Sequence, residues 1–242
     1  MSTSKMSEPS EGLPVAWLAV IIVAAAVIFG LFILVLVGLL VGDSPAGLIG
    51  QVFDKLFAVS SVQAFWYVTR AAGLIAYLLL WLSTAWGVAV STKIFDPVLQ
   101  RTFTYDFHQF LSLLAIGFVI LHIVVLLADK YLPFSVAQIL VPFAAPYRPV
   151  WVGLGTIGLY LTLLVSVTFY IRRWIGQKTF RTIHLVSYIA FVAAALHGLF
   201  AGTDSPLWTV QAMYIVTGLS VVFLTAYRVF TSKRLSNRKS AA

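Results

Sequence analysis

The sequence predicts an all-α integral membrane protein, a bundle of six transmembrane helices. Hydrophobic residues make up 61% of its 242 residues and charged residues only 10%, and the mean hydropathy is +0.98. A soluble domain of this composition would expose too much apolar surface to stay in solution. The apolar residues gather in six runs, each long enough to cross a hydrocarbon core of ~30 Å, for which a helix needs about 20 residues. The predicted spans are 14–42, 64–91, 105–128, 150–171, 181–201 and 207–231.

Short segments flank the predicted six-helix domain, 14–231. Residues 1–13 are predicted to be a disordered cytoplasmic leader, and the first span is too long for the apolar core of a signal peptide, so we interpret it as a retained helix. Residues 232–242 are predicted to be a basic cytoplasmic tail. Apolar residues recur at helical spacing through 48–57, which favours a short connector helix in the outer interface. The proline-rich loop 129–149 is expected to cap the outer ends of the helices.

The distribution of positive charge predicts a multi-pass protein of the cell membrane with both termini in the cytoplasm. With the N-terminus inside, 12 of the 16 lysines and arginines fall on the cytoplasmic side, which is the bias of the positive-inside rule. The net charge of +8 therefore reflects topology and contact with lipid. Nucleic-acid binding is not expected, because it would need basic residues on a folded surface with stacking aromatics. Without cysteine, the chain has no disulfide and no cysteine-held metal cluster.

The four histidines of the chain occupy two of the predicted spans in matched pairs. Spacings of 14 residues in the third span and 13 in the fifth correspond to rises of about 21 and 19.5 Å along a helix. Both spans begin at the cytoplasmic side, so each carries one histidine at an inner depth and one at an outer depth. Polar groups in lipid need partners, and neutral imidazole is an axial ligand of haem iron. We therefore expect two haems b between spans three and five, held by His108 with His184 and by His122 with His197.

Other interpretations of the histidines are weaker but stay open. A single membrane histidine often makes only a helix-packing hydrogen bond. A transporter or channel with structural histidines would require polar pore-lining residues or broken helices at mid-membrane, and the spans are mostly too apolar for that. Zinc and non-haem iron need three or four converging ligands. Thirteen residues also fall about 140° short of four full turns, so either a bulge or kink brings His184 and His197 onto one face, or the two haems are approached from different directions.

The chain resembles the ferric reductase-like transmembrane domain, which is shared by ferric reductases, NADPH oxidases and the haem-binding membrane subunit of methionine sulfoxide reductase. The resemblance covers about residues 60–231. It rests on the two histidine spacings and on three short stretches: RRWIG at 172–176, FRTIH at 180–184 and LHG at 196–198. The resemblance implies the same pairing of histidines around an outer and an inner haem b.

The resemblance also implies transmembrane electron transfer to an external acceptor, so the chain is expected to be an oxidoreductase component. The related oxidases continue into flavin and nicotinamide domains, which the residues after 231 are too few to form. We therefore expect a separate flavoprotein reductase or membrane quinol as donor. A quinol-oxidising subunit that feeds a periplasmic reductase, such as methionine sulfoxide reductase, is the alternative within this fold. Such subunits commonly lack an equivalent of His108, so its presence favours two haems.

Arg70 is the remaining candidate site residue, near the outer end of the second predicted span. A charge at that depth must face protein, headgroups or a cofactor rather than lipid. Snorkelling to the headgroups is one explanation. The other is an ion pair with a propionate of the outer haem or with an incoming acceptor, and the resemblance implies an arginine beside the outer haem. Asp106 and Asp204 lie near opposite ends of the predicted electron path, where helix capping is the simpler role and proton movement the alternative.

Overall fold

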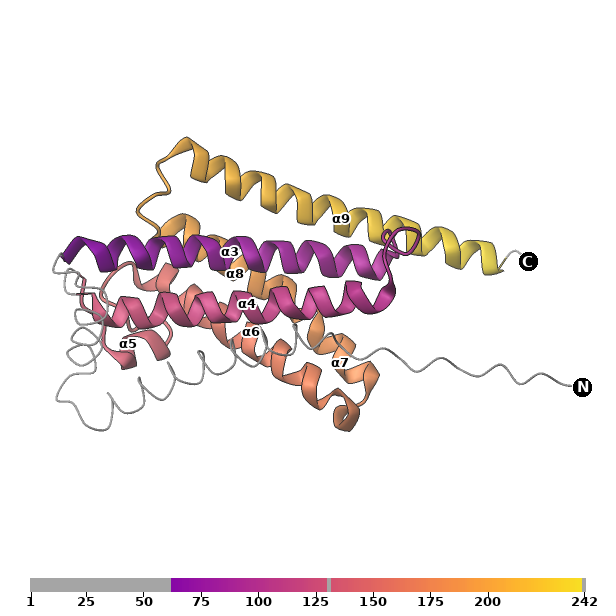
Figure 1. Ribbon diagram of the computed structural model, residues 1–242, viewed down its shortest axis with the longest axis horizontal. Coiled ribbons are helices and arrows are strands. Elements are labelled where there is room, and N and C mark those ends of the chain that lie inside the picture. The colour runs from indigo at the N-terminus through magenta and orange to yellow at the C-terminus, as the bar shows by residue number, and fades with distance from the viewer. Residues whose placement is uncertain (1–61, 130–131, 241–242) are drawn as a thin grey trace, which may run out of the picture.

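The computed structural model describes residues 62–129 and 132–240, and every regular element in these ranges is a helix (Figure 1). The first predicted span, the leader and the connector at 48–57 lie outside the described residues. The helices are α3 (Val62–Thr92), α4 (Arg101–Ala128), α5 (Val136–Leu140), α6 (Pro149–Ile175), α7 (Gln177–His184), α8 (Val186–Ala201) and α9 (Trp208–Ser240).

Five helical segments of the described chain are long and apolar enough to cross a membrane, and they coincide with the second to sixth predicted spans. The fifth is built from α7 and α8 together, and α9 continues to Ser240, well past the predicted boundary at residue 231. Large apolar side chains cover the outward surface of α9, including Leu219, Val222 and Phe223, which are 63%, 65% and 69% exposed. Such a surface is stable against lipid and costly in water. The chain is therefore a multi-pass helical membrane protein.

Two helix pairs form the body of the bundle. α3 packs along α4, α6 packs along α8, and α9 lies against α3 on the far side from α4 (Figure 1). α9 is tied to α3 by two buried or half-buried hydrogen bonds: Tyr77 Oη lies 2.6 Å from Thr217 Oγ1, and Trp81 Nε1 donates to Ser220 Oγ at 2.8 Å. This arrangement leaves α4 and α8 to face each other across the space between the two pairs.

The short helix α5 lies at one end of the bundle and α7 at the other (Figure 1). We call these the outer end and the inner end, names that follow the predicted topology. At the outer end, the chain before α6 packs onto α4, as expected for loop 129–149, and Thr156 Oγ1 donates to the carbonyl of Ile139 at 2.9 Å. The buried side chains of this cap are Phe65, Val124, Val125, Leu127, Ala128, Phe134, Ile139 and Ala145.

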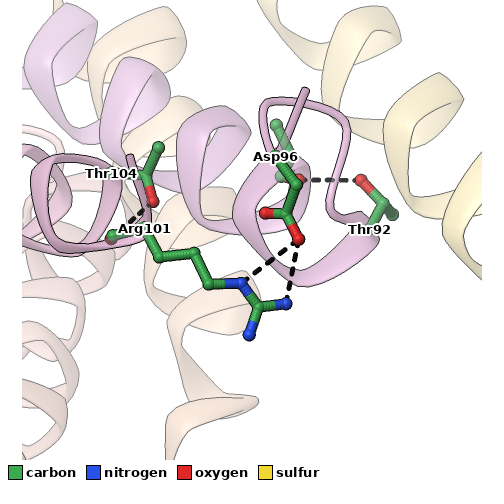
Figure 2. Close-up of polar contacts among 5 residues, drawn as sticks. Thr92, Asp96, Arg101 and Thr104 are labelled. Atoms are coloured by element: carbon green, nitrogen blue, oxygen red, sulfur yellow. Dashed lines mark hydrogen bonds and ion pairs between the residues drawn. The ribbon is translucent and has the colours of Figure 1, made fainter. Parts of the chain in front are cut away.

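At the inner end, the connection between α3 and α4 is held by an ion pair and by an indole. Arg101 Nη2 lies 2.9 Å from Asp96 Oδ2, and Arg101 Nε donates to the same oxygen at 3.2 Å (Figure 2). The indole of Trp86 in α3 donates to the carbonyl of Thr104 in α4 at 2.9 Å, and its ring stacks on Phe95. These contacts fix how far α4 is shifted along α3, and so which residues of the two helices meet.

The fifth span is interrupted at Leu185. The amide of Leu185 donates to the carbonyl of Thr182 at 3.3 Å, and that of Tyr188 donates to the carbonyl of Leu185 at 3.2 Å. These bonds join residues three apart, as in a 3₁₀ turn, which advances about 120° per residue instead of about 100°. The break changes the direction in which His184 projects relative to His197. A break in the span is one of the two explanations that the 13-residue spacing left open.

Two histidine pairs form the candidate functional site

The four histidines lie in two pairs. In each pair one histidine comes from α4, and its partner comes from α7 in one pair and from α8 in the other. The ring centres of His108 and His184 are 6.0 Å apart and their planes make an angle of 75°. The ring centres of His122 and His197 are 6.3 Å apart, with an angle of 79°. We call His108 and His184 the inner pair and His122 and His197 the outer pair. These are the partners that depth in the membrane predicted.

The spacing within each pair fits one metal ion held between two imidazoles. A metal–imidazole bond of about 2.0 Å, and about 1.1 Å from the nitrogen to the ring centre, place two opposed rings about 6.2 Å apart. In residues 62–129 and 132–240 no group of three or more His, Cys, Asp or Glu side chains is placed to hold a metal. A metal held by either pair would need further ligands, which a cofactor can supply. Haem iron, with four porphyrin nitrogens and two free axial positions, has that requirement.

The outer pair lines an apolar cavity of about 240 Å³ that is walled by α3, α4, α6, α8 and the start of α9. Among its lining residues, Thr69 is 5% exposed, and its Oγ1 atom has no hydrogen-bond partner in the described part of the chain. Apolar walls with a few polar atoms are typical of sites for largely apolar cofactors. The residues of the outer pair therefore fit a haem in both spacing and surroundings.

The imidazole of His122 lies directly against the backbone of α3. Its Nδ1 atom donates a hydrogen bond to the carbonyl of Thr69 at 2.7 Å. Gly73, four residues further along α3, leaves the space that the ring occupies, because a Cβ atom there would lie 3.0 Å from Nδ1. We call this combination, a hydrogen-bond acceptor followed four residues later by a glycine, a glycine notch.

His197 occupies a second glycine notch, on α6. Its Nδ1 atom donates to the carbonyl of Trp151 at 3.0 Å, and a Cβ atom on Gly155 would lie 2.6 Å from that nitrogen. An imidazole that donates through Nδ1 keeps the lone pair on Nε2, which is the atom then available to a metal. A hydrogen bond from the second ring nitrogen to a carbonyl is also the usual support of a metal-binding histidine.

His108 occupies a third notch, whose acceptor is a hydroxyl. Its Nδ1 atom lies 3.3 Å from Ser83 Oγ, and a Cβ atom on Gly87 would lie 3.0 Å from the ring. Ser112 Oγ donates to the carbonyl of His108 at 2.9 Å and lies 2.8 Å from Ser83 Oγ. Because each hydroxyl carries one proton, Ser83 must donate to Ser112 and accept from His108.

His184 differs from the other three. Its Nδ1 atom is buried and has no hydrogen-bond partner among the described residues. The ring instead lies beside Phe180, with the ring centres 5.3 Å apart. The inner pair thus has weaker polar support than the outer pair.

Arg70 is paired with Asp204 beside the outer pair. Arg70 Nε donates to Asp204 Oδ2 at 2.7 Å, and a second nitrogen of the guanidinium contacts the other carboxylate oxygen. The guanidinium also lies 5.9 Å from the ring centre of Trp66 and 5.7 Å from that of Tyr67. Both charged residues line the cavity of the outer pair. The sequence pointed to each charge separately, but not to their pairing.

Fold and site together define a multi-pass helical membrane protein with two levels of paired histidines. Comparisons of the chain with protein-family models, with curated proteins and with solved structures found no match. The resemblance to ferric reductase-like domains therefore stays an expectation from the sequence.

Proposed function

We propose that the protein is a dihaem b-type cytochrome that carries electrons across the membrane, as ferric reductase-like proteins do. The observation that carries this proposal is the nearness of two imidazoles at each of two levels of one helix bundle, with the ring centres at the spacing of axial ligands. When bound, the haems would supply one-electron carriers at the two levels. The rise of about 21 Å between His108 and His122 fits both levels within a hydrocarbon core of ~30 Å.

The protein's part in this function is to hold, orient and shield the two levels. α4 supplies one imidazole to each level, and the interrupted span of α7 and α8 supplies the other. The glycine notches bring three of the rings close against a neighbouring helix and fix their Nδ1 atoms. The apolar walls around the outer pair exclude water, and this lowers the cost of electron transfer by limiting solvent reorganisation.

In the proposed topology both termini are cytoplasmic and electrons enter at the inner end. Basic side chains gather there: Arg172 and Arg173 lie in the last turn of α6, and Lys178 and Arg181 lie in α7. Such a surface favours encounter with an acidic protein, so a separate cytoplasmic flavoprotein is the preferred donor, with membrane quinol as the alternative. Electrons leave at the outer end to an external acceptor, close to the Arg70–Asp204 pair.

A pyridine haemochrome assay on the purified full-length protein, combined with iron and protein determination, tests the class of protein. We expect haem b at two per chain and a low-spin spectrum typical of two axial nitrogens. A preparation that folds stably in detergent but takes up no haem when expressed with excess precursor would overturn the proposal. A metal other than iron in the same preparation would overturn it as well.

A further inference from the structure

We propose that the chain between α4 and α6 enters the hydrocarbon layer from the outer side and returns to the same side. We call residues 132–147, which include α5, the re-entrant segment. Its exposed apolar side chains contact lipid acyl chains of the outer leaflet, and its buried ones form a wall of the cavity of the outer pair. This inference concerns the membrane fold, and it holds whether or not the histidine pairs bind haem.

The first step of the argument is the composition of the re-entrant segment. It contains no charged residue, whereas Lys130 precedes it and Arg148 follows it. α4 ends and α6 begins at the outer end, so both flanks lie on the same side of the membrane (Figure 1). An apolar segment of fewer than about 17 residues is too short to cross a bilayer as a helix. It either lies at the interface or enters the hydrocarbon layer and returns.

The second step is depth. Thr156 Oγ1 donates to the carbonyl of Ile139, at the end of α5, over 2.9 Å. Thr156 follows Pro149, the first residue of α6, by seven positions, which corresponds to about 10 Å along the helix. The neighbouring residue is Gly155, against which the ring of His197 packs. The end of α5 therefore lies about as deep in the membrane as the outer pair.

The third step is the pairing of backbone groups, because each polar backbone group in hydrocarbon needs a partner within the protein. A capping box closes the start of α5. The last carbonyls of α5, those of Ile139 and Leu140, accept from the hydroxyls of Thr156 and Tyr160, which lie one turn apart on α6. Pro142, just after α5, has no N–H to satisfy. Hydroxyls supplied by a spanning helix are what a helix end away from water requires.

The fourth step is the distribution of apolar side chains over the two sides of the re-entrant segment. Leu140, Val141 and Phe143 are 47%, 53% and 52% exposed. Such a cluster is costly in water and stable against acyl chains. On the other side, Phe134 and Ile139 are buried and line the cavity of the outer pair. The segment thus separates the outer pair from lipid.

The turn that reverses the re-entrant segment is fitted closely to α6. Phe143 has a left-handed backbone with φ of 67°, which is uncommon for a bulky residue and needs support from its surroundings. Gly153 of α6 gives that support, because a Cβ atom there would lie 2.8 Å from the backbone nitrogen of Phe143. The turn can therefore lie directly on the spanning helix.

Single cysteines test the proposal cleanly, because the chain has none of its own. Val141→Cys and the control Pro206→Cys, in the exposed turn between α8 and α9, are made in the full-length protein and reconstituted in liposomes. A charged, membrane-impermeant maleimide is added on both sides. We expect Val141→Cys to react at least about tenfold more slowly than Pro206→Cys, since the reagent needs a thiolate in water. Similar rates overturn the proposal. Leu140→Cys is the second variant if Val141→Cys does not fold.

A nitroxide attached to Val141→Cys in detergent before reconstitution identifies what covers this surface. Contact with acyl chains gives strong spin relaxation by oxygen and weak relaxation by a water-soluble nickel chelate. Strong relaxation by the nickel chelate would place the residue in water. Weak relaxation by both would mean that protein covers it, either the first predicted span or a second copy of the chain. Each of these two results overturns the contact with lipid.

The anchoring role of Tyr160 is tested in the Val141→Cys background. Tyr160→Phe removes the hydroxyl that pairs with the carbonyl of Leu140, so the segment should open toward water and the maleimide reaction should become faster. Tyr170→Phe is the matched control, because that hydroxyl contacts Gln109 of α4 instead. An unchanged rate in Tyr160→Phe contradicts the anchor. None of these readouts involves haem, so they can fail while the proposed function stands.

Discussion

The guanidinium of Arg70 and the carboxylate of Asp204 meet beside the outer histidine pair, with Nε and Oδ2 2.7 Å apart. The two residues come from α3 and from the turn after α8, so the contact joins the two helix pairs at the cavity that holds His122 and His197. It also cancels the charge that a single arginine would place beside the outer level.

This ion pair predicts opposite effects of its two neutral variants on the outer potential. Arg70→Gln leaves an unpaired carboxylate and should lower the potential, whereas Asp204→Asn leaves an unpaired guanidinium and should raise it. The double variant should lie close to the parent, because the two charges are removed together. Potentiometric titration of the three proteins checks this. Shifts of the same sign in both single variants would show that the pair does not act through its charge.

The angle between the imidazole planes predicts the paramagnetic resonance spectrum of the oxidised protein. The planes make angles of 75° in the inner pair and 79° in the outer pair. Nearly perpendicular axial imidazoles leave the ferric d orbitals almost degenerate, so both haems should give highly anisotropic low-spin signals. Spectra recorded near liquid-helium temperature check this. Well-resolved rhombic signals from both sites would instead show that the rings are parallel in the loaded protein.

The notch at Gly87 predicts a selective loss at the inner level. Gly87→Ala would place a Cβ 3.0 Å from Cε1 of His108, so the ring must shift by a few tenths of an ångström, and an overpacked site of this kind costs about 1–3 kcal/mol. We expect weaker haem retention at the inner site and a lower unfolding temperature in detergent. Gly218→Ala is the control, since a Cβ there meets no atom within 4 Å and alanine favours a helix. Equal haem retention and equal unfolding temperatures in the two variants would show that Gly87 is not needed to seat His108.

The contact between Tyr77 and Thr217 predicts how firmly α9 is attached to α3. Tyr77→Phe removes the hydrogen bond but keeps the ring, which packs against Phe191 and Tyr214. Hydrogen bonds between membrane helices contribute about 0.6 kcal/mol on average, so the destabilisation should be small, and haem content should not change. A double-mutant cycle with Thr217→Val measures the coupling. A coupling of zero would mean that this hydrogen bond does not help to hold α9, which leaves packing and the bond from Trp81 to Ser220.

The sequence predicted the spans that the structure describes because apolar length is a strong signal and the bilayer sets the length required. It also predicted which histidines meet. Spans three and five begin at the same side of the membrane, so the depth of each histidine follows from its position along its span. The limits of α9 were less well predicted: the polar composition after residue 231 suggested an end, whereas the helix continues to Ser240.

Other features of the site depend on three-dimensional contacts, which residue spacing in the sequence does not reveal. The break at Leu185 has no proline or glycine nearby to predict it, and the 13-residue spacing indicated only that a break was one of two possibilities. The notches had a visible signal, because Gly73 and Gly87 repeat the 14-residue spacing of His122 and His108. That signal becomes meaningful only once α3 and α4 are known to be antiparallel neighbours. The Arg70–Asp204 pair joins residues 134 positions apart, and no local pattern relates them.

The most direct test of the account is the haem content of double histidine variants. Removing both members of one pair, as in His108→Ala with His184→Ala, should leave one haem per chain with an unaltered spectrum. Removing one member of each pair, as in His108→Ala with His197→Ala, should leave none bound by two histidines. Haem-to-protein ratios of these two variants and the parent, purified side by side, decide the matter. Equal haem loss in the two double variants would contradict the pairing on which the proposed electron path depends.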